Sequence, residues 1–185
     1  MQSSGTTLQL VYEIGLRRLG RRRLAESTGL SEMTVRLELE RLRERRLVDL
    51  RRAGPRLTLS GRAHFARLFE AIRDVRPLLL DTLRLDVVGL AAHIRSEAVP
   101  PAWVARDIAI REGATGLILL RLESAEWAFT HDAEPIRLRN PVDASTLDEA
   151  FRDLAERDHL VVSFGSSRLG AGRGLWSALA QILSS

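Results

Sequence analysis

The 185-residue chain contains no cysteine and no lysine, and Asn140 is its only asparagine. Without cysteine the chain can form neither a disulfide bond nor a thiolate metal site, and this composition fits an intracellular protein. All 28 basic residues are arginines. The codon bias of a GC-rich genome explains both features most simply. A hot habitat, which usually enriches lysine, stays open as an alternative.

Long apolar segments are missing too. No run approaches the roughly 20 apolar residues that a helix needs to cross a bilayer. The N-terminal residues, MQSSGTTLQLVYEIG, lack the basic segment followed by an apolar segment that is typical of a secretory signal. We therefore expect a cytoplasmic protein without a membrane partner. With 45% hydrophobic and 28% charged residues, the chain can fold as one large domain or two small ones.

Charge is divided unequally along the chain, whose net charge is +4. Residues 1–76 carry 17 arginines against 9 acidic residues, a balance of +8. Residues 77–185 carry 11 arginines against 15 acidic residues, a balance of −4. A positive field concentrated on the first part is expected of a domain that binds a phosphate backbone.

Residues 24–59, LAESTGLSEMTVRLELERLRERRLVDLRRAGPRLTL, predict two helices joined by a tight turn and followed by a β-hairpin. Gly29 permits the left-handed turn, and Ser31 is placed to cap the second helix. The apolar residues of that helix recur at the helical period: Val35, Leu39 and Leu42. Because these residues form a buried stripe, the other positions of the helix must face outward.

The hairpin has arginines on both sides of its turn, Ala53-Gly54-Pro55-Arg56. The phrase TGLSEMTVRLELERLRERRLV, followed by LTLSGR, resembles the winged helix-turn-helix domains of bacterial and archaeal transcription regulators. The resemblance covers about the first 75 residues. It implies that the second helix enters the major groove of double-stranded DNA. The alternative is an adaptor that uses the winged helix as a docking surface for another protein.

This resemblance predicts DNA contacts from the outward face of the second helix, from the arginine cluster before the motif and from the wing. The predicted residues are Arg22, Arg23, Ser31, Glu32, Met33, Thr34, Arg36, Leu37, Arg41, Arg51, Arg52 and Arg56. We expect Thr34 and Arg36 to face the major groove, and the wing arginines to contact the backbone or minor groove. For the cluster at residues 17–23, the alternative is a solvated charged corner.

Ser60 is predicted to cap a helix over residues 61–75 with an apolar face wider than a winged helix requires. This face consists of Phe65, Leu68, Phe69, Ile72 and Val75. The apolar segment 77–84 is predicted to be a rigid joint or a homodimer surface, with Phe65, Phe69 and Ile72 at the same interface or joint. The chain therefore divides into a DNA-binding domain (1–76), this joint and a second domain (85–185).

The second domain is predicted to be α+β. The expected order is β-α-β-β-α-β-α, as in a ferredoxin-like or related sandwich. The elements are a strand over 85–94, a helix over 102–112, a hairpin over 116–130, a helix from 143, a strand over 160–164 and a final helix. Ser145 and Asp148 are spaced as a capping box for the helix from 143. We expect this domain to bind an effector or to dimerise.

Residues 106–116, RDIAIREGATG, are similar to a segment of archaeal two-domain winged-helix proteins whose C-terminal domain has no known function. The resemblance supports a two-domain regulator but implies no particular ligand. A helix-capping glycine and a strand start would explain Gly113 and Gly116 without any function.

The pattern predicts neither a catalytic nor a metal site. The four histidines, at positions 64, 93, 131 and 159, show no metal-ligand spacing. Ser166 and Ser167 have no base nearby in sequence to activate them. We therefore predict no cofactor and no enzymatic activity, with an enzyme site in the glycine-rich segment as the more distant alternative.

That glycine-rich segment, residues 165–174, is predicted to be a loop between a buried strand and the last helix. Its backbone N–H groups could hold a small anionic or polar effector. The predicted ligand-binding residues are Gly165, Ser166, Ser167, Gly172, Arg173 and Gly174. The alternative is a flexible surface loop that only connects the two elements.

Overall fold

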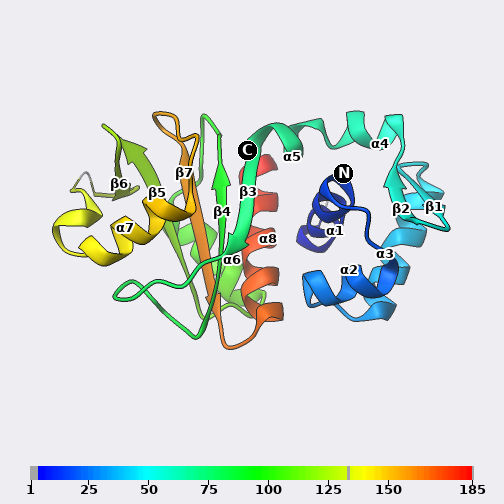
Figure 1. Ribbon diagram of the computed structural model, residues 1–185, viewed down its shortest axis with the longest axis horizontal. Helices are drawn as coiled ribbons and strands as arrows, with labels where there is room; N and C mark the ends of the chain where they lie inside the picture. Colours follow the sequence, from blue (N-terminus) through cyan, green and yellow to red (C-terminus); the bar gives the residue numbers. More distant parts are fainter. Residues whose placement is uncertain (1–3, 133, 185) are drawn as a thin grey trace.

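The computed structural model describes residues 4–132 and 134–184. Figure 1 shows an elongated molecule with a small helical part at one end and a sheet at the other. The last helix, α8 (Arg168–Ser184), lies between them. None of the helices in the described residues is both long enough and apolar enough to cross a membrane.

The helical part is a winged helix-turn-helix, as predicted. It consists of α1 (Gly5–Leu16), α2 (Arg21–Thr28), α3 (Glu32–Glu44), β1 (Val48–Arg51) and β2 (Gly54–Leu57). Gly29 ends α2 in the left-handed conformation with φ 74°, and the Ser31 side chain accepts a hydrogen bond from Thr34 N at 3.0 Å. The stripe of Val35, Leu39 and Leu42 is buried. These local signals are therefore confirmed.

The single helix predicted over residues 61–75 is wrong. Two short helices, α4 (Leu59–His64) and α5 (Ala66–Ala71), are followed by a strand, β3 (Ile72–Pro77). Thr58 rather than Ser60 caps α4, since Thr58 Oγ1 accepts from Gly61 N at 2.9 Å. The chain becomes extended at Ile72 because β3 pairs with β4, so the sheet begins inside the segment that was assigned to the first domain.

The sheet has the strand order β3-β4-β7-β5-β6, and all neighbours are antiparallel. Its other strands are β4 (Val88–Ile94), β5 (Gly116–Glu123), β6 (Glu126–Phe129) and β7 (His159–Gly165). Its helices are α6 (Ala102–Arg111), the short η1 (Ile136–Leu138), α7 (Pro141–Ala150) and α8. The predicted α+β class and the element order from residue 85 onward are confirmed.

Side chains alternate between the two faces of the sheet. Leu117, Leu119 and Val161 belong to the core cluster with α6 and α8. Ile118, Leu120 and Val162 belong to the cluster with α7. The helices therefore cover both faces, whereas in a ferredoxin-like sandwich they lie on one face.

The capping box predicted for α7 is wrong. The helix begins at Pro141, and Ser145 Oγ donates to Pro141 O at 3.0 Å. Asp143 is buried and accepts from the backbone N–H groups of residues 81, 82 and 83 at 2.5–3.0 Å. Burial alone would raise the pKa of Asp143, but these N–H groups and the Thr82 hydroxyl lower it. Asp143 thus anchors the 77–84 segment, with Leu78 and Leu80 buried beside it.

The two parts of the chain share one hydrophobic core. A single cluster of buried residues extends from α1 and α3 through α8 to β4, β5 and β7. The ring centroids of Tyr12 and Trp176, two members of this cluster, lie 5.3 Å apart. Phe65, Ile72, Leu78 and Leu80, predicted at a dimer interface or domain joint, are buried within the chain. Their apolar surface is therefore explained by intramolecular packing.

The loop predicted over residues 165–174 is wrong, because α8 begins at Arg168. The glycines of this segment allow close packing of the helix. A Cβ on Gly170 would lie 2.5 Å from Gly113 O, and one on Gly174 would lie 2.5 Å from Ala114 Cβ. A Cβ on Gly172 would contact Gln9 Nε2 and Thr28 O of the winged helix. These glycines therefore allow other parts of the protein to pack closely against α8.

Candidate nucleic-acid interface

The N-terminal half of α3 presents exposed apolar and basic side chains. Burial of the Val35 stripe turns Met33 and Leu37 outward, with 55% and 44% of their surface exposed. Arg36 lies between them, and half of its side chain is exposed. This face presents hydrogen-bond donors and apolar groups together, the combination that reads base edges in a major groove.

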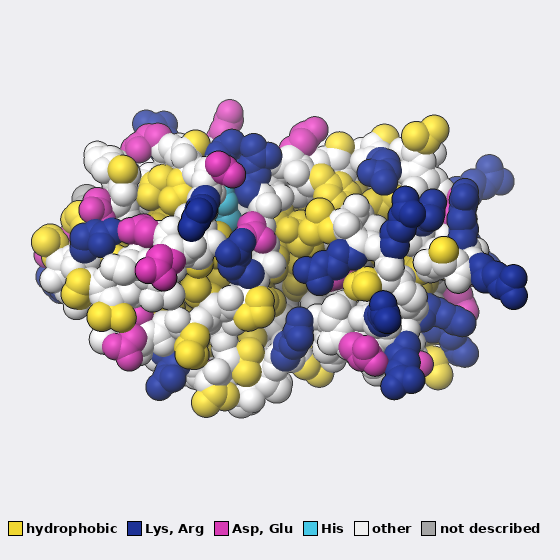
Figure 2. Space-filling model, in the orientation of Figure 1, with side chains coloured by type: hydrophobic (Ala, Val, Ile, Leu, Met, Phe, Trp, Pro, Cys, Tyr) yellow, Lys and Arg dark blue, Asp and Glu magenta, His cyan; other side chains and the backbone are white. Residues whose placement is uncertain are grey.

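A groove of 870 Å³ runs beside this face, between the start of α2, α3 and the turn of the β1–β2 hairpin. It is lined by Arg18, Gly20, Arg21, Arg22, Arg23, Glu32, Met33, Arg36, Arg52 and Ala53. Figure 2 shows many arginine side chains, in dark blue, gathered over the winged-helix end of the molecule. Six arginines and one carboxylate give the groove a strongly positive potential.

Gly54 brings the hairpin turn to the groove. Its φ of 108° is unfavourable for residues with a side chain, and a Cβ there would lie 2.6 Å from Leu19 O. The turn therefore packs directly against the link between α1 and α2. This close approach places Arg52 beside the arginines at the start of α2.

Most arginines of the groove have no carboxylate partner. The side chains of four of them, Arg18, Arg21, Arg23 and Arg52, form neither an ion pair within 4.0 Å nor a hydrogen bond with any part of the chain that the structure describes. Arg22 pairs with Glu26 at 3.1 Å, and Arg36 lies 3.9 Å from Glu40. Exposed pairs of this kind stabilise a protein by only about 0.2–1 kcal/mol, so a phosphate can compete for both arginines.

Two predicted wing residues, Arg51 and Arg56, line a separate groove of 450 Å³. Arg17, Arg18 and Arg62 line it as well, together with Asp49. Arg51 donates to Asp49 at 3.3 Å, and the buried Arg56 Nε has no hydrogen-bond partner within residues 4–132 and 134–184. Since Arg18 lines both grooves, the two sets of arginines form one continuous basic surface.

The remaining predicted DNA-binding residues have structural partners. Thr34 Oγ1 lies 2.8 Å from Ser31 Oγ at the start of α3. Arg41 donates to Glu38 at 2.6 Å, and Glu38 accepts from Thr7 of α1 at 3.0 Å. Arg41 is therefore held along α3, away from the groove-lining set.

Arg18 and Arg21 line the groove but were absent from the predicted set. The sequence did carry a signal for them, because both belong to the arginine cluster at residues 17–23. The cluster alone did not distinguish a phosphate-binding surface from a solvated corner. Only the packing of the Gly54 turn against Leu19 shows that the cluster and the wing share one surface.

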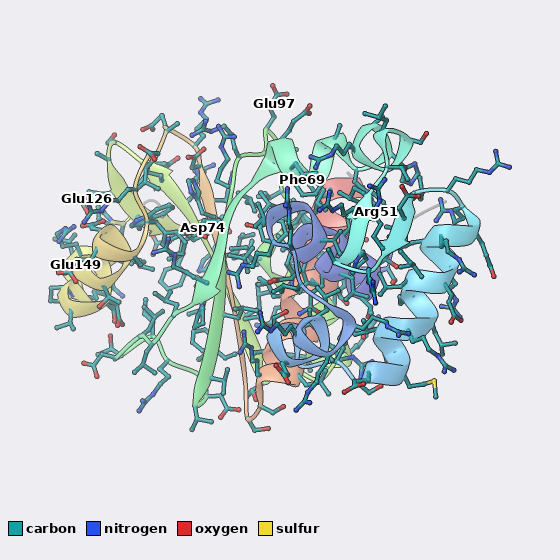
Figure 3. All side chains as sticks on the ribbon, turned by 45° about the vertical axis from the view of Figure 1, so that its right-hand side comes forward. Arg51, Phe69, Asp74, Glu97, Glu126 and Glu149 are labelled. Atoms are coloured by element: carbon teal, nitrogen blue, oxygen red, sulfur yellow. The ribbon has the colours of Figure 1, made fainter. Side chains whose placement is uncertain are left out.

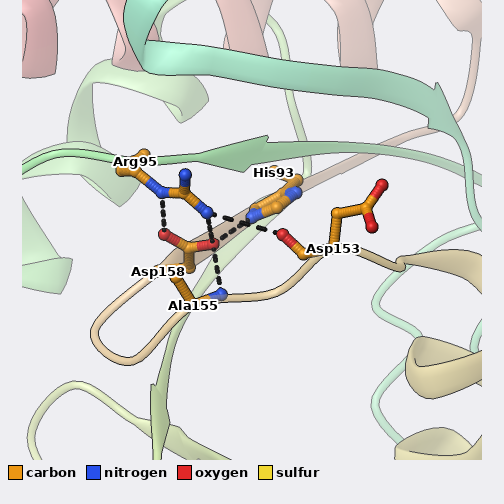
Figure 4. A network of polar contacts seen from close by, with 5 residues as sticks. All are labelled: His93, Arg95, Asp153, Ala155 and Asp158. Atoms are coloured by element: carbon orange, nitrogen blue, oxygen red, sulfur yellow. Dashed lines mark hydrogen bonds and ion pairs between the residues drawn. The ribbon is translucent and has the colours of Figure 1, made fainter.

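A buried polar network lies in the other half of the molecule (Figure 4). His93 Nε2 is 2.7 Å from Asp158, Arg95 donates to Asp158 at 2.9 and 3.0 Å, and Ala155 N donates at 2.9 Å. Burial alone would raise the pKa of Asp158, but Arg95, the Ala155 N–H group and His93 lower it to about 2. Through these bonds the segment before β7, which holds Ala155 and Asp158, is attached to the end of β4.

The residues predicted to bind an effector lie at the start of α8. Gly165 is buried, whereas Ser166 and Ser167 are exposed. Ser167 Oγ accepts from Gly170 N at 3.2 Å, and Arg173 pairs with Glu112 at 3.5 Å. Gly172 and Gly174 face neighbouring helices and strands. The reason for expecting a ligand at these two glycines is therefore removed.

Comparison with known proteins finds similarity to a protein family, to a curated regulator and to a solved structure. Residues 6–72 match the family described as the CggR N-terminal DNA binding domain. The central glycolytic genes regulator of Priestia megaterium (strain DSM 319 / IMG 1521) is 36% identical over 93 residues, or 49% of this chain and 27% of that protein. The chain thus spans about a quarter of the length of this relative.

The third match covers the whole chain. The structure of hypothetical protein PH0730 from Pyrococcus horikoshii OT3 has a TM-score of 0.78 and 21% identity, and covers 100% of this chain and 94% of that one. This match shows the shared fold. Together the three matches confirm the predicted resemblance: residues 6–72 are similar to the DNA-binding domain of a transcription regulator, within a two-part fold also found in an archaeal protein.

Proposed function

We propose that the chain is a sequence-specific, double-stranded DNA-binding regulator of transcription. The observation that carries this proposal is the arginine-lined groove beside the exposed face of α3. The sequence match of residues 6–72 to a DNA-binding domain supports it. Such a regulator acts where the DNA is, in keeping with the expected cytoplasmic location.

In the proposed complex, α3 enters the major groove with its N-terminal half. Arg36 donates to a guanine edge, Glu32 accepts from a cytosine amino group, and Met33 or Leu37 contacts a thymine methyl group. Arg21, Arg22, Arg23 and Arg52 bind phosphates on either side. Gly20 starts α2 without a side-chain cap, so the first N–H groups of this helix also face a phosphate.

The second candidate is a protein-interaction adaptor. The exposure of Met33 and Leu37 favours it, because apolar side chains on a helix face also suit a protein partner. Salt separates the two candidates. DNA binding through six arginines weakens steeply with salt, because the release of counterions from the DNA becomes less favourable as the salt concentration rises. An apolar contact is much less sensitive to salt.

We also propose that the protein acts as a homodimer, with the sheet-containing half serving for sensing or dimerisation. One recognition helix reads only a few base pairs, and regulators of this kind gain specificity by spanning two half-sites. The dimer surface is to be sought among apolar residues that the chain leaves exposed, such as Leu79, Leu138 and Val142. A sedimentation experiment that gives a monomer at micromolar concentration, with and without DNA, would contradict this part.

Selection from random duplexes tests the main proposal. The purified chain should enrich a defined sequence, and Arg36→Ala should lose the preference at one base position. Arg84→Ala is the matched control, since Arg84 is exposed and lies outside both grooves. Failure to enrich any sequence, with a folded protein, would overturn the assignment.

A further inference from the structure

A cavity of 660 Å³ lies on the α6 face of the sheet, far from the basic grooves in sequence. It is bounded by the start of α6, by β5 and by the residues after β6. Its lining residues are Val99, Pro100, Pro101, Ala102, Trp103, Arg106, Leu117, Ile118, Leu119, Arg121, Phe129, Thr130, His131 and His159. A volume of this size is typical of sites for small molecules.

The lining combines apolar walls with basic groups. Arg106, Arg121, His131 and His159 supply nitrogen donors, and none of the described lining residues is acidic. Carboxylates do lie just outside: Glu123 pairs with a terminal nitrogen of Arg121, and Asp107 lies 3.6 Å from Arg106. The cavity itself therefore favours a ligand with a negative group.

Two polar atoms at this site have no hydrogen-bond partner among the residues that the structure describes. One is Nδ1 of His159, a residue that is only 4% exposed. The other is the buried Nε of Arg121, which faces His159 across the β5–β7 pairing. Leaving a buried polar group unpaired is costly, and a guanidinium nitrogen such as Arg121 Nε can only donate. The Arg121 side chain therefore favours a ligand that accepts hydrogen bonds, and His159 Nδ1 favours a polar one.

The start of α6 reinforces this preference. Pro101, Ala102 and Trp103 line the cavity, and no side chain caps this end of the ten-residue helix. The unpaired N–H groups at a helix start carry a partial positive charge, which stabilises an anion. The start of α6 and the basic side chains therefore both favour binding of an anion.

The apolar walls define the rest of the ligand. Trp103 is 61% exposed at the cavity, an unusual position for a tryptophan in a soluble protein. Val99, Leu117 and Phe129 line the same cavity. Such walls fit an aromatic ring or a branched hydrocarbon.

We propose that this cavity binds a small organic acid that carries its carboxylate on an aromatic or branched apolar body. The carboxylate accepts from Arg121, His159 and Arg106, and the apolar body packs against Trp103. This inference rests on the cavity alone and is independent of DNA binding. It also assigns the effector a site other than the glycine-containing segment at residues 165–174.

The test uses phenylacetate, 3-phenylpropionate and 4-phenylbutyrate, each compared with its primary amide, on the full chain. Trp127 and Trp176 are buried, so the quenching of fluorescence by acrylamide reports mainly on Trp103. At least one acid should shield Trp103 with saturable binding, and its amide should bind at least ten-fold more weakly. No saturable binding by any acid, or equal binding of acid and amide, would overturn the proposal.

Variants localise the site. Arg106→Gln and Arg121→Gln should each weaken the acid at least five-fold and leave the amide nearly unchanged. Arg111→Gln, on the same helix but outside the lining, is the matched control and should bind like the wild type. Arg106 is half exposed, so its replacement keeps the fold even if a change at the buried His159 does not. Acid binding that is indifferent to both cavity arginines would also overturn the proposal.

DNA affinity without acid should be the same for Arg106→Gln and the wild type, because Arg106 lies outside both basic grooves. A chain that binds the acid but no duplex DNA would contradict only the proposed function. A chain that binds DNA but none of the acids would contradict only the cavity assignment.

Discussion

The arginines at the two ends of the molecule differ in their partners. At the winged-helix end, Arg21, Arg23 and Arg52 have no carboxylate within 4.0 Å among the described residues. At the sheet end, Arg95 binds Asp158, and Arg137 binds both Glu126 and Asp148. Figure 3 shows Arg51 at the first end and Glu126 and Glu149 at the other. These three winged-helix arginines thus leave their charge available, whereas Arg95 and Arg137 stabilise the fold.

This comparison predicts that arginine substitutions separate into two classes. Substitutions in the groove should weaken DNA binding and leave stability nearly unchanged. Substitution of the paired arginines at the sheet end, Arg95 and Arg137, should lower stability and leave DNA binding nearly unchanged. The shared core between the halves is unaffected by either class, because it consists of apolar residues such as Tyr12 and Trp176.

The largest effect is expected when Arg21, Arg22 and Arg23 are all replaced by alanine. Losing three phosphate contacts should weaken duplex binding by about 100-fold at low salt, on the order of 1 kcal/mol per contact. Fluorescence anisotropy with a labelled duplex measures the change. The midpoint of thermal unfolding should stay within a few degrees of the wild-type value. A triple variant that binds DNA as tightly as the wild type would contradict the assignment of these arginines to DNA binding.

The next effect concerns stability. Arg95→Ala removes the main partner of a buried carboxylate and should lower the free energy of unfolding by about 2 kcal/mol, since Arg95 is itself 42% exposed and water can replace part of the interaction. Urea unfolding measures this loss. Arg84→Ala, which breaks no ion pair, is the control. If the two variants had the same urea midpoint of unfolding, the Asp158 network would contribute nothing to stability.

The contribution of Asp158 to stability should also depend on pH. The pKa of Asp158 is lowered from 3.8 to about 2, so its stabilising effect is present above pH 4 and is lost as the pH falls toward 2. The full loss corresponds to about 2 kcal/mol. Asp143 has a lowered pKa as well, so the wild type must be compared with Asp158→Asn. The variant should be less stable at pH 7 and depend less on pH between 4 and 2; identical pH curves would contradict this.

The last prediction compares two arginines of the winged helix, Arg36 and Arg51, in their effect on DNA affinity. Arg36→Ala should cost about 1–3 kcal/mol on the preferred sequence and relax the preference at one base pair. Arg51→Ala should weaken all sequences alike and by less, because Arg51 already shares its charge with Asp49. Competition with duplexes changed at single positions distinguishes the two. If Arg36→Ala preserved every preference, α3 would not be the reading helix.

The winged helix was predictable because its signals are local. Gly29, Ser31 and the stripe of Val35, Leu39 and Leu42 lie within 14 residues of one another, and each acts through neighbours on the same helix or turn. The charge excess also pointed to the part of the chain that holds the arginine-lined groove. What local reasoning missed was the part of the groove made by Arg18 and Arg21, because that part depends on contact between Gly54 and Leu19.

The errors arose where distant contacts decide the structure. Ile72 looked like the continuation of an apolar helix face, but it pairs with Ile94 in the sheet. Gly174 looked like a position that a ligand could approach, but Ala114 occupies the space. A glycine in the sequence indicates that another group approaches the backbone closely, but it does not identify that group. The cavity beside His159 and Arg121 was missed for the same reason, since 38 residues separate two side chains that pair across strands.

The most direct test of the central claim is the salt dependence of binding to a selected duplex. For the wild type, the logarithm of the binding constant should fall linearly with the logarithm of salt concentration, with a slope of about −0.9 for each phosphate contact. The variant lacking Arg21, Arg22 and Arg23 should have a slope shallower by about 2.7. Equal slopes for the two proteins, or a wild type that binds no duplex more tightly at low salt, would contradict the assignment of the groove to DNA.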